Sequence, residues 1–163
     1  YFEEAKNQLD TLWSRNEINF THLLLLGRYL IHASEFRKAD TVLQKAKEIH
    51  PYALPQMNDL LGKRFLMDKK YQEALPYFLA KLRDSPGDAS AMYAVAKVFY
   101  ASGNTGESYQ WLSKAFEAGF NCYWVLKYDE VWNKERNSAK WRSITSDLHP
   151  KPFAEPEMII FHR

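Results

Sequence analysis

The feature that most constrains this chain is a short pattern of small residues and prolines that recurs at nearly fixed spacing. A Leu-Gly pair, an alanine and a proline occur twice in the same order, 35 residues apart, and a weaker third copy follows 34 residues later. The two clear copies are Leu26-Gly27, Ala39 and Pro51, then Leu61-Gly62, Ala74 and Pro86. A repeat of this length predicts a stack of small supersecondary units. Such arrays usually work by presenting a surface to a partner.

Each copy reads as two helices separated by a break. In the first copy, apolar or small residues lie at helical positions i, i+3, i+4 and i+7, namely Leu23, Leu26, Gly27 and Leu30. A break at Ser34-Glu35 precedes a second helix, which Pro51 ends because proline has no amide hydrogen and disfavours helix at the preceding residue. We expect small residues where the two helices meet. The expected pairs are Gly27 with Ala39, Gly62 with Ala74, and Ala96 with Ser108.

The order Leu-Gly, Ala, Phe or Leu, Ala and Pro resembles the tetratricopeptide repeat, a helix–turn–helix unit of about 34 residues. The resemblance implies an all-α helical solenoid, an α–α superhelix, over about residues 1–119. It places repeats at 20–53, 55–88 and 89–120, with 2–16 as the second helix of a truncated upstream half repeat. The sequence departs from the family pattern where Lys81 replaces a small residue and where the third copy lacks its glycine and proline.

The repeat register ends after Gly119. Residues 120–148 resemble the closing segment of bacterial tetratricopeptide proteins, which implies a cap of short helices over the last repeat. Its aromatic residues also leave open a peptide-binding aromatic cleft. We expect residues 149–163, which contain three prolines, to form an extended tail. Three roles stay open for its apolar run at 158–161: folding back on the cap, self-association with a neighbouring chain, or leading into a further domain.

Composition argues against several classes of function. The 22 basic and 20 acidic residues nearly balance, so we expect neither nucleic acid nor an anionic membrane as a partner. No apolar run approaches the roughly 20 residues of a membrane-spanning helix. The chain begins at Tyr1 rather than Met, so a signal peptide or an upstream domain is an open expectation. Localisation therefore stays open between the cytoplasm and the periplasm.

No residue pattern indicates catalysis. The single cysteine, Cys122, has no base near it in sequence, and neither a nucleophile elbow nor a glycine-rich phosphate loop occurs. The histidines show no HExxH or other metal-ligand spacing; they are His22, His32, His50, His149 and His162. We therefore expect no enzyme activity, no catalytic residue, no metal and no cofactor.

One face of the predicted first helices carries a basic residue in each repeat. Arg28, Lys63 and Lys97 recur at repeat spacing, with neighbours at helical i+3 and i+4 positions. In tetratricopeptide arrays the first helices line a concave groove, so the resemblance implies that this face meets a partner. The candidate groove residues are Arg28, Ile31, Asp59, Lys63, Leu66, Tyr93, Lys97 and Tyr100. The alternative is an ordinary solvated face, in which Asp59 and Lys63 form an intrahelical ion pair.

The expected function is therefore a non-catalytic protein–protein interaction module that binds a peptide or protein segment, with an acidic or carboxylate-bearing segment as one candidate. The asparagines of the family's chaperone-binding carboxylate clamp are missing, since Leu24, Arg28, Asp59 and Lys63 occupy the compared positions. This argues against a chaperone's acidic C-terminus as the partner. The alternative function is an accessory domain that oligomerises or positions a larger enzyme or receptor.

Overall fold

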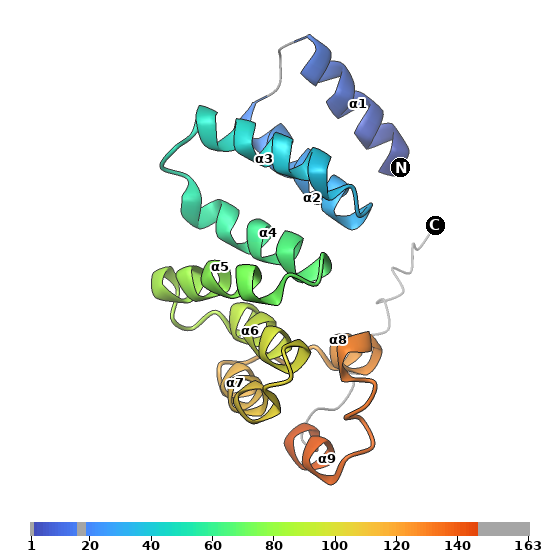
Figure 1. Ribbon diagram of the computed structural model, residues 1–163, viewed down its shortest axis with the longest axis vertical. Helices are drawn as coiled ribbons and strands as arrows, with labels where there is room; N and C mark the ends of the chain where they lie inside the picture. The colour runs from blue at the N-terminus through green and yellow to red at the C-terminus, as the bar shows by residue number, and fades with distance from the viewer. Residues whose placement is uncertain (1, 16–18, 147–163) are drawn as a thin grey trace, which may run out of the picture. The chain divides into compact units, whose positions relative to one another are not determined.

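The structure, a computed structural model, describes residues 2–15 and 19–146, and within these ranges it is all-α with no strand (Figure 1). This confirms the predicted fold class. The chain forms two compact units, residues 1–120 and 121–163. The helices of the first unit are α1 (Phe2–Ser14), α2 (Phe20–His32), α3 (Phe36–Ile49), α4 (Leu54–Met67), α5 (Tyr71–Asp84), α6 (Ala89–Ala101) and α7 (Thr105–Glu117). Those of the second unit are α8 (Tyr123–Tyr128), the 3-10 turn η1 (Glu130–Trp132) and α9 (Ala139–Thr145).

The first unit is built from helical hairpins that pack one after another, as in a repeat solenoid. The closest packing is within the pairs α2–α3, α4–α5 and α6–α7. Between pairs, α5 packs closely on α6, while α4 touches both α2 and α3. α1 packs on α2, where Leu9 joins the core of the first hairpin. Each hairpin therefore buries its apolar face partly within itself and partly against its neighbour, as expected of stacked repeats.

The three hairpins share one turn conformation. Ser34, Lys69 and Gly103, each in the turn between the two helices of its hairpin, all have left-handed backbone conformation, with φ of 60°, 59° and 84°. Each donates its amide hydrogen to the carbonyl three residues earlier, and the next residue donates to the carbonyl five residues earlier. This bond pair is the Schellman motif, which satisfies the last carbonyls of the preceding helix. It recurs at Gly119, after α7.

Gly27 and Gly62 face larger side chains than the expected alanines. A Cβ atom placed on Gly27 would lie 2.9 Å from Leu43 Cδ2, and one on Gly62 would lie 2.8 Å from the ring of Phe78. The atoms nearest to these two glycines on the second helix of each hairpin therefore belong to Leu43 and Phe78, one helical turn after the expected Ala39 and Ala74. The glycines make room for the bulky residue four positions after each alanine, and the alanines are themselves completely buried.

In the third hairpin the expected pair is confirmed. Ser108 is fully buried, and its hydroxyl donates to the carbonyl oxygen of Ala96 at 2.8 Å. A buried hydroxyl without such an acceptor would be costly. Serine is tolerated at this helix contact because the donor is satisfied across the hairpin.

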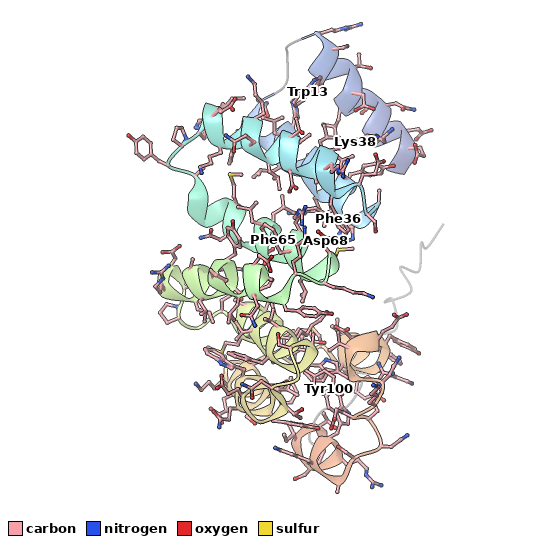
Figure 2. The ribbon with its side chains drawn as sticks, in the orientation of Figure 1. Trp13, Phe36, Lys38, Phe65, Asp68 and Tyr100 are labelled. Carbon is pink, nitrogen blue, oxygen red and sulfur yellow. The ribbon has the colours of Figure 1, made fainter. Side chains whose placement is uncertain are left out.

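A buried arginine joins the first hairpin to the second. The side chain of Arg64 on α4 is 5% exposed, and it donates from Nε and Nη2 to the carboxylate of Asp40 on α3 at 2.7 and 2.6 Å. Its Nη1 donates to Asp68 at 2.8 Å. The guanidinium also lies 5.3 and 4.7 Å from the ring centroids of Phe36 and Phe65. Figure 2 shows Phe36, Phe65 and Asp68 gathered where the two hairpins meet.

The second unit has its own small aromatic core. Trp132 of η1 is fully buried and lies against Trp141 of α9, with ring centroids 5.1 Å apart. Leu126 of α8 is also buried. That this segment covers the last repeat stays a prediction. Residues 147 and 148 and the predicted tail at 149–163 lie outside the described residues.

Candidate partner-binding groove

The eight candidate residues lie on the first helices of the three hairpins. Arg28 and Ile31 are on α2. The residues on α6 are Tyr93, Lys97 and Tyr100. The remaining three, Asp59, Lys63 and Leu66, are on α4.

Most of these residues surround one hollow in the first unit, with a volume of about 210 Å³. Arg28, Lys63 and Lys97 contribute one cation from each of α2, α4 and α6. The other candidates that line it are Ile31, Asp59 and Leu66. Three helices that are separated in sequence by about one repeat therefore direct their basic side chains to the same space.

Sequence reasoning missed three residues that also line the hollow: His32, Leu60 and Met67. A signal for two of them was present. His32 and Met67 stand four positions after Arg28 and Lys63, so they extend the same helix face by one turn. Leu60 could not be recognised in this way, because it also belongs to the buried core of the first hairpin.

Two candidates belong to the core. Ile31 is 2% exposed, and Tyr93 is 6% exposed with its ring stacked on Phe120 at a centroid distance of 4.4 Å. The ammonium of Lys97 lies 5.8 Å from the Tyr93 ring centroid. Tyr93 therefore packs beneath this region instead of offering an open aromatic surface. Neither Tyr93 nor Tyr100 is among the residues that line the hollow.

Asp59 is the acidic group of the hollow, and it is held between two lysines. Its carboxylate lies 2.6 Å from Nζ of Lys63, which confirms the expected intrahelical pair, and 3.1 Å from Nζ of Lys81 on α5. Burial acts to raise the pKa of Asp59, but the hydrogen bonds and charges of Lys63 and Lys81 outweigh it and hold that pKa below its usual value. The carboxylate is therefore ionised near neutral pH and already neutralised by its partners.

The charge balance of the hollow is positive. Lys81 also pairs with Asp88, the N-cap of α6, at 3.0 Å. The two positive charges of Lys63 and Lys81 are therefore balanced by the two negative charges of Asp59 and Asp88. Within the described part of the chain, Arg28 forms no ion pair and its side chain is exposed. An anionic group that enters the hollow would meet Arg28, Lys63 and Lys97 with only one carboxylate among the lining residues.

The described residues offer little for metal or nucleophilic chemistry. Among them, no group of three or more His, Cys, Asp or Glu side chains is placed to hold a metal ion. Cys122 is exposed and belongs to the second unit. No helix in the described ranges combines the length and apolar character that crossing a bilayer requires.

Comparison of the chain with protein-family models, with curated proteins and with solved structures finds no match. The helical repeat arrangement thus stands on the geometry of the hairpins themselves.

Proposed function

We propose that this chain is a tetratricopeptide-like array that catalyses no reaction and binds an acidic peptide or protein segment along its first helices. The observation that carries the proposal is the convergence of Arg28, Lys63 and Lys97 on one hollow. One cation per repeat, delivered at repeat spacing, is what an extended ligand with several contact points requires. The resemblance to tetratricopeptide arrays, whose first helices line the groove, supports the same choice.

The size of the hollow limits what it can receive. Pockets for whole small-molecule ligands usually have about 300 to 1,000 Å³, whereas this one has about 210 Å³. It therefore suits one or two side chains or a terminal carboxylate of a longer segment. Arginine presents two parallel donors to a carboxylate, so Arg28 is the residue best suited to hold the acidic group.

Selection from a peptide library followed by charge reversal tests the proposal. The immobilised chain is screened against a library of displayed peptides with free C-termini, and the enriched sequences are synthesised with a fluorescent label. We expect the enriched peptides to be acidic. We also expect Arg28→Glu combined with Lys63→Glu to weaken their binding at least about tenfold in fluorescence anisotropy, while circular dichroism still shows the helical fold.

The matched control reverses two charges away from the groove. Arg37 and Lys47 are exposed on α3, so Arg37→Glu with Lys47→Glu changes net charge by the same amount. This variant should bind the enriched peptides like the original chain. Equal binding by both double variants, or enrichment of peptides without acidic residues, would contradict the proposal.

A further inference from the structure

A separate pocket of about 250 Å³ lies in the second unit, and none of its described lining residues belongs to the groove in the first unit. Three cations line it: Lys127 from α8, Arg136 from the turn between η1 and α9, and Arg142 from α9. Tyr123 and Trp141 contribute aromatic rings. No carboxylate is among the described residues that line this pocket.

Arg136 is half-buried, and both of its described hydrogen bonds go to neutral acceptors. Its Nη1 donates to the side-chain oxygen of Asn133, and its Nη2 donates to the backbone carbonyl of Asp129 at 2.7 Å. Its Nε is buried and has no acceptor among the described residues. The guanidinium is therefore held in place, but its positive charge meets no carboxylate in the described part of the chain.

Arg64 in the first unit shows how this chain compensates a buried guanidinium elsewhere. It pairs with two carboxylates, Asp40 at 2.6 Å and Asp68 at 2.8 Å. Withdrawing a charge from water is costly unless an opposite charge meets it. An anion in the second-unit pocket would supply to Arg136 what Asp40 and Asp68 supply to Arg64.

The other two cations of the pocket also have no carboxylate partner among the described residues. The ammonium of Lys127 lies among three aromatic rings, with centroids 5.8 Å away for Tyr123, 5.1 Å for Trp124 and 5.5 Å for Tyr128. Such rings attract a cation but carry no net charge. Arg142 is exposed on α9. One ligand can therefore be met by three positive charges that are not yet neutralised.

The lining of the pocket selects the kind of anion. A phosphate monoester carries a charge of about −1.5 to −2 at pH 7 and three strong acceptor oxygens, which suits three cations better than a single carboxylate does. Arginine can bind such a group through two parallel hydrogen bonds. The rings of Tyr123 and Trp141 offer apolar surface to an aromatic body that carries the phosphate. The volume is below the roughly 300 to 1,000 Å³ of pockets for whole small-molecule ligands, so it suits one side chain.

We propose that this pocket binds a phosphotyrosine side chain of a partner protein. Arg136 and Arg142 hold the phosphate oxygens, Lys127 adds the third positive charge, and the ring of the ligand packs beside Tyr123 and Trp141. The site lies apart from Arg28, Lys63 and Lys97, so it is independent of the acidic segment proposed for the groove.

Titration of the whole chain, labelled with ¹⁵N, with a capped phosphotyrosine derivative tests the proposal by nuclear magnetic resonance. We expect saturable shifts confined to signals of α8, α9 and Arg136, and no saturable shift with the capped, unphosphorylated tyrosine. Lys127→Gln combined with Arg142→Gln should weaken binding at least about tenfold. Both side chains are exposed, so the variant should keep its fold.

The matched control is Lys134→Gln combined with Lys140→Gln, which removes two exposed charges of the second unit that do not line the pocket. This variant should bind the derivative as the original chain does. The absence of saturable binding, or equal losses in the two double variants, would overturn the proposal. Equally tight binding of inorganic phosphate would overturn it too, because the site would then recognise an anion only.

A further variant tests whether the chain's own C-terminal carboxylates occupy the pocket. It combines Asp147→Asn, Glu155→Gln and Glu157→Gln. We expect it to bind the phosphotyrosine derivative with the affinity of the original chain. Binding that appears only in this variant would assign the pocket to the chain's own acidic residues and overturn the proposal.

Discussion

At Gly62 the missing side chain is what allows the two helices of the second hairpin to approach. The ring of Phe78 is fully buried and lies 2.8 Å from where a Cβ would stand, so neither group can move away easily. We expect Gly62→Ala to lower the free energy of unfolding by about 1 to 3 kcal/mol, despite the better helix propensity of alanine. Urea denaturation followed by circular dichroism measures this.

Gly106 provides the comparison for that substitution. It also lies in a helix, α7, but a Cβ there would meet nothing within 4 Å. Gly106→Ala should leave stability unchanged or raise it by up to about 1 kcal/mol. Equal losses at both glycines would show that the Phe78 contact is not the cause.

The left-handed turn residues give a second prediction at this scale. Lys69 adopts a backbone conformation that costs an L-residue about 1 kcal/mol or more, whereas Gly103 holds the same turn position without that cost. We expect Lys69→Gly to raise the free energy of unfolding by about 1 kcal/mol and Gly103→Ala to lower it by a similar amount. Chemical denaturation of both variants checks the signs, and two shifts in the same direction would contradict the shared turn geometry.

Among the elements, α3 and α4 share an apolar core and are also joined by one buried cation. Arg64 is almost completely buried, and its loss would leave Asp40 without this partner and Asp68 with Lys70 alone. Both carboxylates are partly exposed, which reduces the penalty. We therefore expect Arg64→Met to destabilise the chain by about 1 to 3 kcal/mol.

Lys38→Met is the matched control for that change. Lys38 also pairs with a carboxylate, Glu35, but its side chain is 70% exposed, and such surface pairs contribute little to stability. Thermal unfolding of the two variants should therefore separate them clearly. A melting temperature for Arg64→Met within error of that for Lys38→Met would mean that the Arg64 cluster does not join the hairpins.

The helices and their pairing could be predicted from the sequence because they depend on local patterns: apolar residues at helical spacing, breaks such as Ser34-Glu35, and prolines. The partner of each glycine could not. Spacing shows that Gly27 needs a close neighbour, but whether Ala39 or Leu43 lies opposite depends on the crossing of two helices. The Arg64 cluster was missed for a similar reason, since its pair with Asp40 joins residues 24 positions apart.

On the scale of the whole molecule, several carboxylates link stability to pH. Neighbouring cations hold the pKa of Asp68 below its usual value, with Lys70 as the largest cause, and Asp59 is shifted the same way against its burial. A lowered pKa in the folded state contributes stability that is fully present above the usual carboxyl pKa of about 3.9 and is lost as pH falls through the lowered value.

We therefore expect the melting temperature to change little from about pH 7 to pH 5 and to fall below about pH 4. Asp59→Asn combined with Asp68→Asn should lower the melting temperature at pH 7. It should also reduce the further drop in melting temperature below about pH 4. Asp84→Asn is the control, since Asp84 is exposed and forms no ion pair within the described ranges. Differential scanning fluorimetry across pH distinguishes these profiles, and an unchanged slope in the double variant would exclude the linkage.

Repeat spacing in the sequence predicts part of the candidate groove. Repeat spacing was enough to align Arg28, Lys63 and Lys97, because stacked repeats bring equivalent positions together. It gave no information on Tyr93, whose ring is buried by Phe120 from beyond the third hairpin. It also gave no sign that Lys81, noted only as a departure from the repeat pattern, would share Asp59 with Lys63.

The Schellman turns have a consequence for a chain that is pulled from its ends. Each turn closes its own hairpin with backbone bonds, and the helices pack more extensively within the hairpins than between them. Under tension the contacts between neighbouring hairpins should give way first, and each hairpin should then extend as one block. With a repeat of 34 or 35 residues, a force–extension trace would rise in steps of roughly 12 nm of contour length.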